Sequence, residues 1–160
     1  MTLAQETEMS ATEIDEFLGR NETGVLSLAR DEQPYAIPIS YGYDTSERTF
    51  YLRLVSTPES EKRSFLDSSP EGRIVVYEES TEKRTYWSVV AEGALEEIAP
   101  SSMSVDQIVQ YGQAKPPLFE IWGTGKDELD IQLYELSPDK LSGRRTDIEI
   151  DGEGEVETDF

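Results

Sequence analysis

Apolar positions near the start of the chain recur with the period of a helix. The first of them are Ile14, Phe17 and Leu18, which one helical face would bring together. Ser10 and Glu13 lie three residues apart just before this run, in the spacing of a capping box. Gly19 follows at a place where a helix can end. The pattern predicts a short amphipathic helix over residues 11–18.

After this helix the apolar and polar residues alternate as they do in strands. Six such segments follow, at residues 24–29, 35–43, 49–55, 73–78, 85–98 and 129–136. Most are joined by short polar turns, which favours hairpins. Short helices are predicted over residues 61–67 and 104–111. The expected fold is therefore mainly β, an antiparallel six-stranded β-barrel with short flanking helices.

Proline interrupts the second of these strands. Pro38 has no backbone N–H and cannot donate to a ladder, so the strand must carry an edge, a bulge or an open side there.

The length of 160 residues favours one domain, expected over residues 10–146. Residues 1–9 are expected to form a flexible N-terminus. Residues 147–160 hold seven acidic residues and no basic ones, which favours a disordered acidic tail.

The charge is strongly acidic, with 14 Lys and Arg against 34 Asp and Glu and a net charge of −20. Such a surface argues against binding to nucleic acid or to an anionic membrane, which both recruit basic residues. A dense carboxylate surface with few lysines is typical of proteins kept soluble in high salt, and an acidic mesophilic domain is the alternative. No apolar stretch reaches a membrane span of about 20 residues and no secretory signal opens the chain, so a cytoplasmic location is expected.

The chain has no cysteine and no histidine. These absences exclude disulfides, thiolate nucleophiles, Ser-His-Asp triads and Cys/His metal sites. No metal site is expected, and the sequence singles out no catalytic side chain. Redox chemistry would have to come from a borrowed cofactor.

Three cations stand close together in this acidic chain. Arg53, Lys62 and Arg63 fall within eleven residues, and Ser60 lies among them at the start of a predicted helix. The N–H groups of a helix start favour an anion, and Lys and Arg neutralise its charge, so the cluster is a candidate phosphate seat. In the alternative interpretation, the three cations only pair with nearby glutamates on the surface.

Four pieces of sequence, in order, resemble the pyridoxamine 5′-phosphate oxidase-like family of FMN-binding split barrels. They are residues 24–41 as the opening hairpin, 50–62 as a strand followed by a phosphate-binding lysine, 86–93 as an aromatic-x-Ser-Val strand, and 136–144 as the closing strand. The third piece resembles the general-stress and nitroimidazole-resistance-like branch. The resemblance covers about residues 11–145.

This resemblance implies a homodimer with two FMN sites at the subunit interface. By position, Lys62 would bind the FMN phosphate with help from Arg53, Ser60 and Arg63. The remaining implied cofactor-binding residues are Pro38, Ile39 and Ser40 along the isoalloxazine, and Ser88, which either subunit could supply.

The implied function is an FMN-dependent oxidoreductase acting on a small molecule, with a nicotinamide or deazaflavin electron donor. Deazaflavin F420 is the alternative cofactor. A non-catalytic flavin-binding or redox-sensing module, and a split-barrel dimer that has lost its cofactor, are the alternative functions.

Overall fold

The computed structural model describes residues 2–56, 61–68, 71–99, 105 and 130–150. In chain order its elements are β1 (Thr2–Glu8), α1 (Ala11–Arg20), β2 (Thr23–Arg30), β3 (Gln33–Asp44), β4 (Thr49–Ser56), α2 (Glu61–Ser68), β5 (Glu71–Ser80), β6 (Thr85–Glu97) and β7 (Asp130–Ile150). All strand pairs are antiparallel. The predicted mainly β fold is confirmed. Among the described helices, neither is long and apolar enough to cross a membrane.

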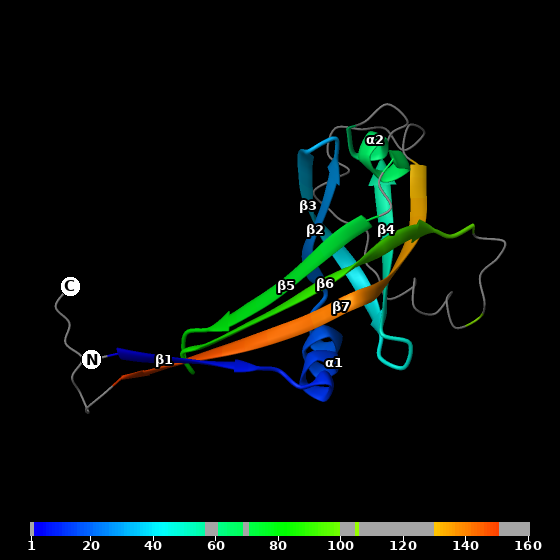
Figure 1. The fold of residues 1–160 in the computed structure, drawn as a ribbon. Helices are drawn as coiled ribbons and strands as arrows, with labels where there is room; N and C mark the ends of the chain where they lie inside the picture. Colours follow the sequence, from blue (N-terminus) through cyan, green and yellow to red (C-terminus); the bar gives the residue numbers. More distant parts are fainter. Residues whose placement is uncertain (1, 57–60, 69–70, 100–104, 106–129, 151–160) are drawn as a thin grey trace.

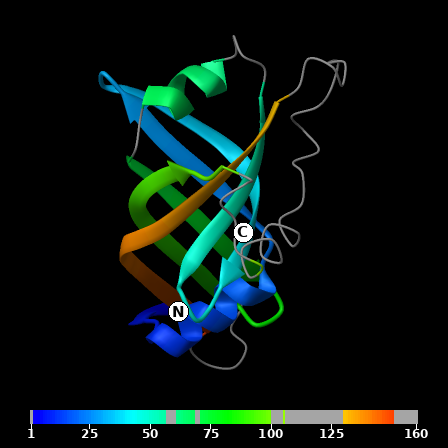
Figure 2. The same ribbon diagram turned by 90° about the vertical axis from the view of Figure 1, so that its right-hand side faces the viewer.

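The sheet closes into a barrel because β7 pairs along both of its edges. The strand order is β1-β7-β4-β3-β2-β5-β6, and β6 pairs in turn with β7. β7 contacts β4 through residues 130–136 and β6 through residues 134–147. The six predicted strands are thus β2 to β7, wound around one core, with the two helices at opposite ends of the barrel (Figures 1 and 2). The predicted six-stranded split barrel is confirmed.

The barrel core is built from every second residue of these strands. Its largest fully buried strand residues are Leu26, Ile39, Phe50, Leu52, Leu54, Ile74, Val76, Val89 and Leu136. The intervening residues lie on the outer face, as the pleat of a strand requires.

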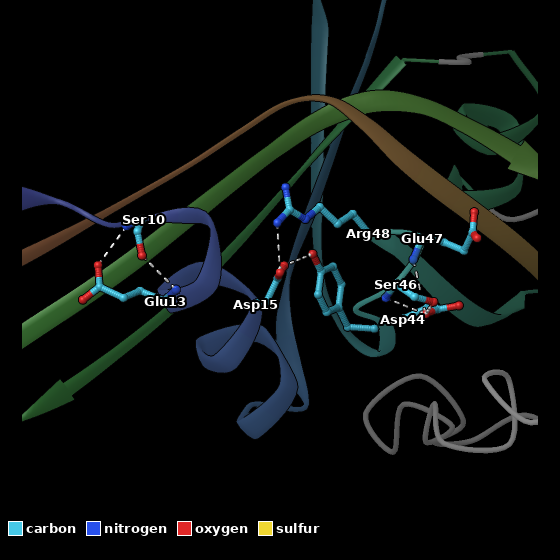
Figure 3. A network of polar contacts seen from close by, with 8 residues as sticks. Ser10, Glu13, Asp15, Asp44, Ser46, Glu47 and Arg48 are labelled. Carbon is cyan, nitrogen blue, oxygen red and sulfur yellow. Dashed lines mark hydrogen bonds and ion pairs between the residues drawn. The ribbon is translucent and has the colours of Figure 1, made fainter.

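Helix α1 forms the plug at one end of the barrel. Its buried residues are the three predicted from the helical period, Ile14, Phe17 and Leu18. The capping box is present, since the Ser10 N–H donates to Glu13 Oε1 at 2.8 Å and the Glu13 N–H donates to Ser10 Oγ at 3.2 Å (Figure 3). The helix passes through Gly19 and ends at Arg20, two residues later than predicted.

Polar contacts fasten this plug to the strands around it. The Tyr41 hydroxyl donates to the Leu18 carbonyl at 2.8 Å, and the Tyr43 hydroxyl donates to Asp15 Oδ1 at 2.8 Å. Arg48 donates to the second oxygen of Asp15 at 3.1 Å (Figure 3). Burial raises the pKa of both tyrosines, and the hydrogen bond and charge of Asp15 raise the pKa of Tyr43 further.

The ends of the chain differ from the sequence expectation. Residues 1–9 were expected to be flexible, yet β1 pairs with β7 from Thr2↔Ile150 to Glu8↔Arg144. An ion pair between Arg144 and Glu6, at 3.6 Å, adds to this ladder. β7 is correspondingly longer than the predicted strand over 129–136, and it takes in residues 147–150 of the expected acidic tail. Beyond residue 136, β7 continues because it pairs with β6 and β1, and not because apolar and polar residues alternate in its sequence.

Two further predictions fall on other parts of the chain. The helix predicted over residues 104–111 lies outside the described residues, apart from position 105. Residues 151–160 of the expected tail lie outside them as well.

Candidate functional site

The strand that carries Pro38 is open along part of one edge. β3 pairs with β2 through Gln33–Ser40, but with β4 only through Tyr41–Asp44. The Tyr41 N–H donates to the Glu22 carbonyl at 3.0 Å, which fixes which β3 nitrogens face β2. By the alternation of an antiparallel ladder, the nitrogen of Pro38 faces the other way, towards the open side. The missing N–H therefore costs the β2–β3 ladder nothing, and the predicted open side is present among the described strands.

The three residues predicted to follow a flavin ring have different environments on this strand. Pro38 is exposed on the outer face, and Ile39 is fully buried in the core. Ser40 is buried, with 6% of its surface exposed. The side chain of Ile39 therefore cannot reach a ligand outside the barrel, and only its backbone is available.

Helix α2 follows β4 and lies against the hairpin of β2 and β3. The Phe65 ring stacks on Tyr35 with centroids 4.9 Å apart, and the Arg30 guanidinium lies 5.1 Å from the centre of the Phe65 ring. Arg30 also donates to the Ser64 hydroxyl. These contacts hold the helix at the end of the barrel where β3 and β4 have separated (Figure 1).

Lys62 lies on the buried face of this helix, together with Phe65 and Leu66 at helical spacing. Only 8% of its surface is exposed, and it is the one charged side chain among the buried residues of the described chain. Lysine is rarely buried, because removing an ammonium group from water is costly unless an anion or hydrogen bonds compensate.

The other predicted members of the phosphate seat are more exposed than Lys62 or lie outside the described residues. Arg63 is half-buried and pairs with Asp67, one helical turn later, at 3.4 Å. Arg53 is half-buried on the outer face of β4, opposite Leu133 of β7. Ser60 lies outside the described residues. Arg63 therefore has an ion-pair partner within its own helix, an aspartate, which neither interpretation of the cluster predicted.

Ser88 is not close to the open strand within one chain. It lies half-buried on β6, opposite Tyr77 of β5, and β3 is three strands away in the order β3-β2-β5-β6. Three strand spacings correspond to about 14 Å. A single subunit therefore does not bring Ser88 together with Pro38 and Ser40.

Sequence analysis missed a hollow on the outer face of the sheet. Its floor is Gly24, Val25, Pro38 and Val75, and Tyr77 lies at its edge with 68% of its surface exposed. The cavity volume is about 500 Å³. The sequence did contain a sign of this hollow, because Val25 and Val75 are apolar residues at positions of β2 and β5 that face outward. Alternation alone does not show which of two apolar faces is the core.

A smaller hollow of about 300 Å³ lies further along β2 and β5, next to Ser27 and Gly72. Arg73 and Glu92 line it and form an ion pair at 2.7 Å.

Comparison with known proteins identifies relatives of the chain. The family model described as pyridoxamine 5′-phosphate oxidase matches residues 10–145. None of the curated proteins compared matches the sequence.

Solved structures share the fold over most of the chain. An FAD-binding protein from Mesorhizobium loti is similar with a TM-score of 0.66 and 22% identity, over 91% of this chain and 98% of that one. An FAD-binding protein from Mycobacterium smegmatis is similar with a TM-score of 0.61 and 20% identity, over 88% of this chain and 98% of that one. A protein from Bacteroides thetaiotaomicron that is proposed to act in 5-nitroimidazole antibiotic resistance is similar with a TM-score of 0.64 and 14% identity. The match covers 92% of this chain and 93% of that one. At these identities the likeness establishes the fold.

Proposed function

The chain belongs to the pyridoxamine 5′-phosphate oxidase family, and on that basis we propose that it is a flavoprotein that binds FMN with the phosphate at Lys62. Two of the similar structures are FAD-binding proteins, which supports a flavin as the ligand. FMN is preferred to a dinucleotide because it ends in a phosphate dianion, the group that a lysine and arginine cluster suits best.

The burial of Lys62 is the observation that carries this proposal. A chain with a net charge of −20 keeps one lysine almost out of solvent at the end of its barrel. A phosphate within reach of that ammonium would accept a charge-assisted hydrogen bond from it. Arg53, Arg63 and Ser60 are the proposed assisting groups.

The isoalloxazine is proposed to lie along Pro38, Ile39 and Ser40. The open side of β3 leaves backbone groups of this segment directed away from β2, and a flavin edge offers both acceptors and one N–H donor. Tyr35 marks where α2 contacts β3, and Pro38 is three residues further, about 10 Å along a strand. That separation leaves room for the ribityl chain between ring and phosphate.

A homodimer is proposed to complete the site. Ser88 is about three strands from Pro38 in its own chain, so it would meet the flavin only as a residue of the second subunit.

The proposed activity is oxidation or reduction of a small molecule, with electrons from a reduced nicotinamide or a deazaflavin. The bound flavin would supply hydride transfer, and the protein would hold the ring and exclude water. A flavin-binding module without turnover is the alternative. Bleaching of the bound flavin by NADH or NADPH, followed by recovery with an acceptor, would distinguish the enzyme from the module.

The test compares Lys62→Met with Lys83→Met, which changes an exposed lysine in the β5–β6 turn. We expect Lys62→Met to weaken FMN binding by roughly 1.5–3 kcal/mol, the value of a charge-assisted hydrogen bond, and Lys83→Met to leave it unchanged. Quenching of flavin fluorescence during titration measures both. Equal affinities in the two variants would refute the phosphate assignment, and a parallel titration with deazaflavin F420 would decide between the two cofactors.

A further inference from the structure

The larger hollow on the outer face begins at Pro38, the residue at which the open edge of β3 meets the outer surface. Val25 lies opposite Pro38 across the β2–β3 pair, and Val75 lies opposite Val25 across the β2–β5 pair. These residues form a continuous apolar floor across three strands. Tyr77 stands at its edge with its ring accessible to a flat molecule placed on the floor.

Only acidic residues supply charge to the lining of this hollow, and these are Glu78 and Glu79. Glu78 is already compensated, because Arg20 lies 3.2 Å from its carboxylate and Asn21 donates to it at 3.1 Å. These contacts hold the pKa of Glu78 below its usual value despite its partial burial. Glu79 is exposed and forms no ion pair with the described residues. The hollow therefore presents one uncompensated carboxylate and no lining cation.

We propose that this hollow is the substrate pocket, and that it takes a flat heteroaromatic molecule that is cationic or neutral and excludes an anionic one. This inference rests on the proposed function, because Pro38 would bring the pocket beside the flavin. The floor buries the flat face of the substrate. Tyr77 stacks on it and favours a cation through its π face. Glu79 attracts a positive charge and repels a negative one.

The neighbouring hollow does not reverse this preference. Its one cation, Arg73, is neutralised by Glu92 at 2.7 Å. Among the described residues that line the two hollows, none offers an unpaired cation to the dianion of a phosphorylated substrate such as pyridoxamine 5′-phosphate.

The experiment uses three probes of nearly equal shape: 1-methylnicotinamide as the cation, nicotinamide as the neutral molecule and nicotinate as the anion. Each is titrated into the flavin-loaded protein by calorimetry at low ionic strength, where charge effects are least screened. We expect the cation to bind at least about fivefold more tightly than the anion, with the neutral probe between them.

Two variants assign this preference to the pocket. Glu79→Gln is expected to bring the cation-to-anion ratio towards one, whereas Glu82→Gln, which removes the same charge from the exposed β5–β6 turn, is expected to leave it unchanged. Tyr77→Ala is expected to weaken all three probes. FMN affinity, measured separately by flavin fluorescence, is expected to be the same in every variant.

Several results would overturn the inference. They are tighter binding of nicotinate than of the cation, an unchanged ratio in Glu79→Gln, or no binding of any probe. The last result, together with a dimer that Tyr77→Ala weakens in analytical ultracentrifugation, would show that the second subunit fills the hollow. Absence of FMN binding would refute the proposed function instead. In that case the same probe titrations on the protein as purified would still decide the preference of the pocket.

Discussion

The two ends of the barrel use their polar side chains in different ways. At the α1 end, Asp15 accepts from Tyr43 and Arg48, and Tyr41 donates to the Leu18 carbonyl, so the polar groups fasten the helix to the strands. At the α2 end, a lysine is buried on the inner face of the helix, beside a strand whose edge is open. The first end is organised for stability. The second end places a buried cation beside an open strand edge, and local features of this kind are typical of functional sites.

The apolar contacts of the two helices differ in the same sense. α1 places Phe17 and Leu18 fully inside the barrel. α2 packs Phe65 against Tyr35 and Arg30 at the end of the β2–β3 hairpin. The difference predicts that substitutions at the α1 end change the free energy of unfolding, whereas substitutions of charge at the α2 end change ligand affinity.

The largest expected effect is that of Phe17→Ala. This ring is fully buried, so its loss should lower the free energy of unfolding by about 3–5 kcal/mol through lost transfer energy and the cavity left behind. Urea unfolding followed by circular dichroism measures the change. The matched substitution Tyr77→Ala, at a largely exposed aromatic, should change it by less than about 0.5 kcal/mol. Similar losses in the two variants would contradict the role of α1 as a plug.

Alkaline pH should also act mainly on the α1 end. Burial raises the pKa of Tyr41 and Tyr43 there, and it raises the pKa of one tyrosine near α2, Tyr134, which lies within electrostatic reach of Arg63 and Asp67. A tyrosine whose pKa is raised on folding keeps its full contribution to stability below its unfolded pKa of about 10. The contribution then falls as the pH rises towards the folded value. We expect the free energy of unfolding to decrease above about pH 10, by up to about 1.4 kcal/mol per pH unit for each such tyrosine.

Urea unfolding between about pH 8 and pH 11 would measure this slope. The double substitution Tyr41→Phe and Tyr43→Phe should make the slope shallower, whereas Tyr86→Phe, at a partly exposed tyrosine, should not. A slope that persists in the double variant would assign the alkaline transition to other groups.

The smallest expected effect is that of Ser10→Ala. The substitution removes the acceptor for the Glu13 N–H at the start of α1 and should lower the free energy of unfolding by about 1 kcal/mol. FMN affinity should stay unchanged, because the capping box lies at the opposite end from Lys62. Ser46→Ala in the exposed β3–β4 turn is a control for loss of a surface hydroxyl. Weaker FMN binding in Ser10→Ala would show that the two ends are coupled.

The sequence predicted most of what depends on neighbouring residues. Ser10 and Glu13 marked the start of α1, and Pro38 marked the strand that opens. The six strands of the barrel followed from alternation. Gly93 shows where such reasoning stops. It lies at an irregularity of the β6–β7 pairing, where a Cβ would come within 2.6 Å of the Ser137 carbonyl oxygen, and only the pairing reveals that constraint.

The candidate site was predictable in part. Lys62 could be selected because few cations occur in this chain, but its burial and the pairing of Arg63 with Asp67 could not be read from spacing. The outer hollow was missed because Val25 and Val75 follow the same alternation as core residues. Ser60 and the predicted homodimer and salt adaptation stay predictions.

The sequence by itself determined the kinds of element, their order and the acidic character of this protein, because helical period, turn residues and charge are local properties of the chain. The tertiary structure decided that Thr2–Glu8 becomes a strand, that β7 is shared between two neighbours, and that one lysine lies out of solvent. These features arise from partners up to about 150 residues apart in the chain, and backbone pairing and burial across such separations leave no local pattern to read.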